Sequence, residues 1–356
     1  MYNKVVKLTE DNILCHQLYF YNKMFTADGK YLLYAKNDGK RSLYLMNLTD
    51  GSSKKLTDED DIDDFGANLS ADDKAFIYFR RGEIIRQEIT TGDKKTLYTT
   101  PEGWNGYTNP SISKDNRFLV TIEMKEEDVL RSDTGSWDIF EPQFRKKPLC
   151  RIVYVDLEQG TTNIVHQEQC WLGHPQIRPN HHSDIAFCHE GPATLIDSRL
   201  WFIQANGTNL RCLRHQKPDE IITHEFWLRD GSQLAFVYRK MLGNNEVSHV
   251  NQSILYINPD TLEETHVTDC SVYCHTNTDH TGRYLVGDGQ DPEHPYIFIT
   301  DLHEKKERIL CRHDTTWKTY GNNQDSHPHP VFTPDGSHVL FTSDKDGLPG
   351  IYMVSV

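Results

Sequence analysis

A repeated turn constrains the fold more than any other feature of this chain. Residues 25–34 (Phe-Thr-Ala-Asp-Gly-Lys-Tyr-Leu-Leu-Tyr) and 332–341 (Phe-Thr-Pro-Asp-Gly-Ser-His-Val-Leu-Phe) are copies of one unit near the two ends of the sequence. Weaker copies lie between them, and internal repeats of this length indicate a modular architecture. Alignment on the turn gives seven anchors, 43 to 65 residues apart: Asp28, Asp72, Asp115, Asn180, Asp230, Thr281 and Asp335.

Each anchor begins a hairpin turn that leads into a short alternating strand, and two further strands follow in most units. Four short strands per unit are typical of a propeller blade. We therefore predict an all-β fold, a single seven-bladed β-propeller that occupies residues 1–356 as one domain; a β-solenoid or a sandwich is the alternative. The last unit lacks a fourth strand, and residues 7–9, which repeat the Lys-Leu-Thr of residues 55–57, are predicted to close it from the N-terminus.

The composition and charge of the chain indicate its cellular compartment and the kinds of partner that it can bind. No run of 18 apolar residues occurs, so no membrane span is predicted, and the N-terminus does not resemble an export signal. Eight scattered cysteines without a Cys-x-x-Cys pair are typical of reduced thiols, and we expect a cytoplasmic protein. The net charge of −14 argues against nucleic acid or an anionic membrane as a partner. An anionic ligand would need a local positive site, from a metal or an arginine. The oligomeric state is left open.

The repeat places histidines in register. The residue six positions before each anchor falls in the strand that should line the propeller axis, and these residues are Asn22, Gly66, Asn109, His174, His224, His275 and His329. Four consecutive units carry histidine there, so their side chains are expected to point toward a common volume. Two insertions, residues 125–148 and 191–198, are expected to form a substrate-facing rim.

A metal site is predicted from the last two units. His327 and His329 are two residues apart in Ser-His-Pro-His-Pro, and on an extended edge strand they would face the same side. Three imidazoles and a carbonyl oxygen can bind a divalent metal and leave positions open for substrate. The candidates are His275, His327, His329 and the amide of Gln324. This ligand set does not choose among Mn²⁺, Zn²⁺ and Ni²⁺.

Several longer blocks carry a family resemblance. They occur in the order 15–21 (Cys-His-Gln-Leu-Tyr-Phe-Tyr), 171–175 (Trp-Leu-Gly-His-Pro), 187–192 (Phe-Cys-His-Glu-Gly-Pro), 223–227 (Thr-His-Glu-Phe-Trp), 312–318 (Arg-His-Asp-Thr-Thr-Trp-Lys) and 326–330 (Ser-His-Pro-His-Pro). Nearly end to end, the chain resembles the oligogalacturonate lyases. One departure is residues 287–295, a stretch that looks shorter than is common in the family, which leaves the preferred chain length of the substrate open.

The resemblance implies a cytoplasmic seven-bladed propeller that cleaves short oligogalacturonides, especially digalacturonate, to unsaturated keto-uronates. Family enzymes depend on manganese, and their metal ligands fall on four residues here, His275, Gln324, His327 and His329. Their catalytic base falls on His224, and an arginine near the reacting sugar falls on Arg199.

These residue types suit β-elimination, in which the C5 proton of a uronate leaves and the oxygen at C4 is expelled. A metal on the carboxylate would stabilise the developing charge, and neutral His224 could take the proton. Arg199 could offer a fixed cationic fork to a carboxylate, although a salt bridge at the rim is the alternative. His174 and His189 are expected to contact substrate, or to support neighbouring groups instead.

Two other functions are open from the residues alone. A non-enzymatic TolB-like propeller would share the repeat but has no reason to align histidines. A metal-dependent hydrolase or lactonase would favour carboxylates at the axis, where this register has Asn, Gly and His. A glycosidase is not favoured, because it would need two facing carboxylates across the bond and the aligned positions supply no such pair. Glu190 and Glu225 are the acidic residues beside the histidine motifs, and we expect them to orient histidines.

Overall fold

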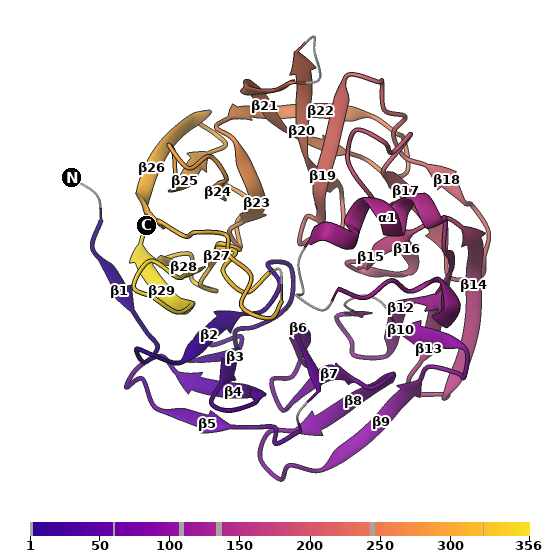
Figure 1. The fold of residues 1–356 in the computed structure, drawn as a ribbon, viewed down its shortest axis with the longest axis horizontal. Coiled ribbons are helices and arrows are strands. Elements are labelled where there is room, and N and C mark those ends of the chain that lie inside the picture. Colours follow the sequence, from indigo (N-terminus) through magenta and orange to yellow (C-terminus); the bar gives the residue numbers. More distant parts are fainter. Residues whose placement is uncertain (1–2, 60, 107–109, 133–136, 243–245, 323) are drawn as a thin grey trace. The chain divides into compact units, whose positions relative to one another are not determined.

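A computed structural model describes residues 3–59, 61–106, 110–132, 137–242, 246–322 and 324–356. Across these residues the strands form seven antiparallel sheets, one after another along the chain (Figure 1). Six of the sheets have four strands each, and in the remaining one β10 (Trp104–Gly106) and β11 (Ser111–Ile112) both pair with β12 (Phe118–Lys125). The fold class is a seven-bladed β-propeller, as predicted.

The chain divides into two compact units, which are described separately. The first comprises Met1–Arg81, Ile85–Lys95 and Cys270–Val356, and the second comprises Gly82–Ile84 and Thr96–Asp269. The assignment of all 356 residues to one domain stays a prediction. No helix within the described residues is both long enough and apolar enough to cross a membrane.

The first unit holds most of four sheets. Their strands are β2 (Leu14–Gln17), β3 (Tyr31–Asn37), β4 (Arg41–Asn47) and β5 (Ser53–Lys55); β6 (Ile62–Leu69), β7 (Ala75–Arg80), β8 (Glu83–Glu88) and β9 (Lys94–Thr99); β23 (Tyr273–Thr278), β24 (Tyr284–Gly289), β25 (Tyr296–Asp301) and β26 (Lys306–Arg312); and β27 (Val331–Phe332), β28 (His338–Ser343) and β29 (Gly350–Ser355), to which β1 (Val5–Lys7) is added. Buried side chains from β24 to β29, such as Ile299 and Phe341, form the core between the last two sheets.

The second unit holds three sheets and the helical segments. Its remaining strands are β13 (Leu149–Asp156) and β14 (Thr161–Gln169); β15 (Leu172–Arg178), β16 (His181–His189), β17 (Leu200–Gln204) and β18 (Arg211–Cys212); and β19 (Glu220–Trp227), β20 (Leu234–Leu242), β21 (Glu246–Ile257) and β22 (Glu264–Cys270). The insertion at 125–148 contains η1 (Glu126–Asp128), η2 (Trp137–Ile139) and α1 (Phe140–Lys146). Buried apolar side chains fill the space between successive sheets.

The repeated motif is a turn held by side chains. Thr26 donates a hydrogen bond to Asp28 (2.7 Å) and accepts one from the amide of Tyr31 (3.0 Å). The same hydroxyl–carboxylate pair recurs at Ser70–Asp72, Ser113–Asp115 and Thr333–Asp335. Short polar side chains favour turns because they satisfy backbone donors locally. In these four sheets the motif therefore fixes where the strand after the turn begins.

The N-terminal segment completes the last sheet, as predicted. β1 pairs with β29 in the order β1-β29-β28-β27, and Figure 1 shows the indigo strand beside the yellow one. The strand starts at Val5, two residues earlier than the motif indicated, and the contact continues beyond it because the amide of Leu8 donates to the carbonyl of Ile351 (2.8 Å). This pairing covers an edge that would otherwise be open.

The first strand of several sheets is bulged at the position that the repeat aligns. Pairing shifts between Asp63 and Asn68 in β6, and between Gly173 and Gln176 in β15. It shifts again around His224 in β19 and around His275 in β23. A bulge re-aims the side chain that it carries. A register shift therefore recurs at the aligned position in these four sheets, while Asn109 lies outside the described residues.

We predict that Leu8→Pro destabilises the protein by about 1–3 kcal/mol, because proline removes the amide that bonds Ile351 and leaves a carbonyl unsatisfied. The measurement is urea unfolding followed by tryptophan fluorescence. Leu8→Ala keeps the amide and is the matched control. An equal loss of stability in both variants would show that the side chain, and not the backbone bond, closes the sheet.

Candidate functional site

Three predicted metal ligands meet in the first unit. One ring nitrogen from each of His275, His327 and His329 lies within 4.8 Å of the others, and all three side chains are buried. The rings of His275 and His329 are closest, with centroids 4.1 Å apart and planes at 73°. Such an arrangement can hold one divalent cation between three imidazoles. The expectation that histidines of different sheets converge is confirmed for β23 and the segment before β27.

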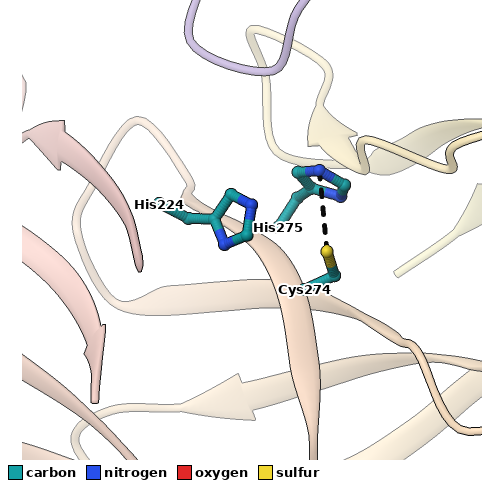
Figure 2. A group of neighbouring side chains, drawn as sticks. All are labelled: His224, Cys274 and His275. Carbon is teal, nitrogen blue, oxygen red and sulfur yellow. Dashed lines mark hydrogen bonds between the residues drawn. The ribbon is translucent and has the colours of Figure 1, made fainter. Parts of the chain in front are cut away.

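Asp288 on β24 fixes the orientation of His275. Its carboxylate accepts a hydrogen bond from His275 Nδ1 at 2.8 Å and another from the His275 amide at 2.6 Å. With Nδ1 engaged in this way, Nε2 is the ring nitrogen that could bind a cation. The Cys274 thiol lies 3.7 Å from Nε2, and Figure 2 shows this contact as a dashed line.

Ionisation differs between these neighbouring imidazoles. Burial lowers the pKa of His275, but the Cys274 thiol and the Asp288 carboxylate outweigh it and raise the pKa to about 10. Burial, together with the positive charge of His275, lowers the pKa of His327 to about 3. His327 is therefore neutral and able to coordinate, whereas a cation would have to displace a proton from His275.

The segment that carries His327 and His329 is not the extended strand that we predicted. Residues 324–330 form a turn and an irregular stretch before β27, and His329 has a left-handed backbone with φ = 45°. The prolines that follow both histidines suggested extended backbone, but the turn in which the His327 amide bonds the carbonyl of Gln324 (3.0 Å) overrides that preference. The rings meet because the chain turns, not because alternate residues share a face.

Charged and polar contacts hold this turn from several directions. Arg41 on β4 donates to Asp325 and to Asp64, both at 2.8 Å. The carbonyl of His329 accepts a hydrogen bond from the side chain of Gln17. Thr315 donates to the carbonyl of Ser326 at 2.5 Å. These contacts restrain the positions of the two histidines before any ligand binds.

Aromatic rings surround the imidazoles. Trp317 packs edge-on against His327 with centroids 4.7 Å apart, and Tyr19 packs against His329 at 5.0 Å. Phe20 lies 5.7 Å from His275. These rings lower the local polarity, which strengthens any charge interaction at the site.

The donor set fits a divalent cation. Among the described residues, none donates a hydrogen bond to the buried side-chain oxygen of Gln324, and an amide oxygen of this kind is a suitable hard ligand. Three imidazole nitrogens and one amide oxygen would bind a metal without adding negative charge. Participation of Gln324 stays a prediction.

Arg199, in the second unit, lies in a buried ion-pair network. Its Nε donates to Glu225 at 2.7 Å and its Nη1 donates to Glu190 at 3.1 Å. Burial raises the pKa of both glutamates, but the guanidinium outweighs it and holds each pKa below its usual range. The arginine is 5% exposed, and it forms the kind of salt bridge that we considered as its alternative role.

Of the two glutamates that we expected to orient histidines, only Glu190 does so within the described residues. Glu190 does orient a histidine, since its carboxylate lies 3.0 Å from His174 Nε2. Glu225 instead holds Arg199 with both of its oxygens. His174 and His224 have left-handed backbones, with φ of 47° and 55°, which cost about 1–3 kcal/mol each and persist only where the surroundings impose them.

The two insertions meet beside Glu190. Gly191 has φ = 144°, and a Cβ there would lie 2.4 Å from the ring of Phe144 in α1. Only glycine allows this close approach. The contact places the helix of the first insertion against the start of the second, next to the carboxylate that binds Arg199 and His174. A substrate-facing role for this rim stays a prediction.

Sequence reasoning missed Asp288, because acidic residues are common and its spacing from His275 has no motif. It also treated His166 as an ordinary surface histidine. His166 and Glu168 lie at alternate positions of β14, and His189 lies at the end of β16, with His189 Nε2 3.4 Å from Glu168. The alternation of His166, Glu168 and Cys170 in the sequence was the available signal.

We predict that Asp288→Asn weakens binding of Mn²⁺, the cation that the resemblance implies, by roughly 10- to 100-fold, since loss of the carboxylate frees the His275 ring to turn. Titration calorimetry on chelator-stripped protein measures this. Asp291→Asn, in the exposed loop after β24, is the control and should bind Mn²⁺ like the parent. Unchanged affinity in the Asp288 variant would exclude the orienting role.

Comparison with known proteins identifies the family. A family model described as oligogalacturonate lyase matches residues 2–356. The oligogalacturonide lyase of Pectobacterium atrosepticum is 37% identical over 99% of this chain and 93% of its own length, and the oligogalacturonate lyase of Dickeya dadantii is 35% identical over the same shares.

Solved structures agree with these relatives. An oligogalacturonate lyase in complex with manganese matches with a TM-score of 0.94 and 37% identity, over 99% of this chain and 93% of that one. The oligogalacturonate lyase of Vibrio parahaemolyticus matches with a TM-score of 0.92 and 37% identity, over 99% and 94% of the two chains. With this fold and these buried imidazoles, the chain belongs to the oligogalacturonate lyase family.

Proposed function

We propose that this protein cleaves short oligogalacturonides, digalacturonate above all, by metal-assisted β-elimination to unsaturated keto-uronates. The observation that carries the proposal is the meeting of His275, His327 and His329, with Asp288 orienting the first. Membership of a lyase family and a manganese-bound relative support it. We further propose that the enzyme acts in the cytoplasm, without nucleic acid or membrane as a partner.

His275, His327, His329 and Gln324 would hold Mn²⁺. When bound, such a cation supplies a Lewis acid that stabilises negative charge developing on a uronate carboxylate. The bound cation would also explain how a chain with a net charge of −14 can bind an anion, because the cation supplies positive charge at the site itself. Zn²⁺ or Ni²⁺ could occupy the same nitrogen and oxygen ligands.

His224 is the proposed base that takes the C5 proton. An imidazole is substantially neutral near pH 7, so it can accept a proton without prior deprotonation. Its neighbour in the chain, Glu225, is 2% exposed and bonded to Arg199, which holds this part of β19 in place. The left-handed backbone at His224 is maintained by that support.

Arg199 is proposed to act on the substrate as well as to hold the glutamates. Its three side-chain hydrogen bonds to described residues use three of the five N–H donors of a guanidinium, so two remain for a uronate carboxylate. His174 is proposed as a further substrate contact, with its ring positioned by Glu190. Substrate contact by His189 stays a prediction.

The Arg199 network disfavours a glycosidase. A general acid in that chemistry must keep a carboxyl group protonated near neutral pH. Glu190 and Glu225 both have depressed pKa values because the same guanidinium stabilises their charged forms. Neither is suited to protonate a leaving group, which leaves elimination with an imidazole base as the better-supported reaction.

We expect chelator-stripped protein to be inactive on digalacturonate and to recover activity when Mn²⁺ is added. Absorbance of the unsaturated product in the ultraviolet follows the reaction. If absorbance does not rise either with or without added metal, a propeller that binds a ligand without cleaving it would be favoured. Equal activity in both conditions would contradict the role of the metal.

We expect His224→Ala to keep its bound metal but to lose roughly 10²- to 10⁴-fold in kcat, as for removal of a general base. His327→Ala should lose both metal and turnover. Metal content is measured by elemental analysis of purified protein, alongside kcat. His303→Ala, at an exposed position after β25, is the control. Full activity with full metal content in either test variant would overturn the assignment.

A further inference from the structure

A second group of metal-binding side chains lies in the second unit, on strands β14 and β16. His166 and Glu168 occupy alternate positions near the end of β14, Cys170 directly follows that strand, and His189 ends β16. Ligand atoms of Glu168, Cys170 and His189 all lie within 4.8 Å of one another. His166 Nε2 lies 3.1 Å from the same carboxylate. Alternate residues of a strand share one face, which explains how His166 and Glu168 lie on one side of β14, and Cys170 continues the same spacing just beyond the strand.

The carboxylate of Glu168 is the centre of this group. His166 and His189 both approach it, and their hydrogen bonds and charges outweigh burial and hold the pKa of Glu168 well below its usual range. Its side chain is 40% exposed, whereas those of His166 and His189 are 17% and 16% exposed. A cation could therefore reach the group from solvent and become largely enclosed by it.

The rest of the group is restrained before a cation arrives. The ring of Trp201 stacks on His189, with centroids 4.5 Å apart and planes at 18°. His189 Nε2 lies 3.4 Å from the Glu168 carboxylate. Burial, with a smaller contribution from Glu168, raises the pKa of the Cys170 thiol to about 12, so the thiol is protonated when no cation is present.

We propose that His166, Glu168, Cys170 and His189 form a binding site for a zinc-class divalent cation. On binding, the Cys170 thiol loses its proton to solvent, and the thiolate and the Glu168 carboxylate then neutralise the two positive charges. Four protein ligands of nitrogen, sulfur and oxygen suit a tetrahedral Zn²⁺ and leave no position open for substrate. The soft sulfur separates this site from the imidazole and amide set around His275.

The site would join two neighbouring sheets of the second unit, because β14 and β16 belong to different ones. Its role is structural, so loss of the cation should lower stability without changing the elimination reaction. It also gives His189 a function other than substrate contact, since the nitrogen that binds a cation cannot also bond a sugar.

Cobalt provides the test. A thiolate bound to Co²⁺ gives an intense near-ultraviolet charge-transfer band, whereas imidazole ligands alone do not give one. Chelator-stripped full-length protein carrying His327→Ala, which disables the first site, is titrated with Co²⁺. We expect one equivalent to bind with the thiolate band, and Zn²⁺ to displace it. Adding Cys170→Ser should abolish the band and weaken binding at least about 10-fold.

Cys274→Ser is the matched control, since that thiol lies beside His275, and it should leave the band unchanged. In the parent background, Cys170→Ser should keep the lyase rate of Mn²⁺-loaded protein and abolish the rise in melting temperature on adding Zn²⁺. A missing band, a band that survives Cys170→Ser, or one lost in Cys274→Ser would overturn the proposal. Failure of the proposed lyase activity would leave the cobalt result unaffected.

Discussion

The structure depends on a backbone constraint that recurs at the start of its sheets. The first strand of a sheet is bulged or turned at one aligned position, where the side chain is directed away from the ladder. In β15, β19 and the segment before β27 that position carries a histidine in left-handed backbone, a conformation that L-residues avoid. A bulge or turn re-aims the side chain that it carries, so these imidazoles depart from the alternation of a regular strand.

Charge is balanced locally rather than across the whole chain. In the first unit, Arg41 lies between Asp64 and Asp325 and thereby restrains the turn that carries two imidazoles. In the second unit, Arg199 lies between Glu190 and Glu225. In both cases one guanidinium forms ion pairs with two buried carboxylates, whose charged forms would otherwise be costly to desolvate. The sequence as a whole is acidic, with a net charge of −14, so an anionic sugar would need the positive charge of a bound cation or an arginine.

Two kinds of cation site follow from two ways of arranging ligands. Around His275, buried imidazoles from separate sheets approach one another, and Asp288 fixes the ring that carries the proton. Around Glu168, the proposed ligands come from the end of β14, the residue that follows it and the end of β16, and they include sulfur and carboxylate. The first arrangement leaves room for a substrate oxygen, and the second encloses its cation with protein groups. The difference in donor atoms is what would keep the two sites from competing for the same metal.

Periodicity was enough to determine the fold class, the seven sheets, the closing strand from the N-terminus and the alignment that singles out His275 and His329, because turn motifs and strand alternation are local properties of the chain. His327 was found for the wrong reason, since an extended strand was expected where the chain turns. Asp288, the ion pairs of Arg199 with Glu190 and Glu225, and the group around Glu168 emerged only from the tertiary structure. Their side-chain directions are set by bulges, turns and packing between strands distant in sequence, and a two-residue period does not encode those.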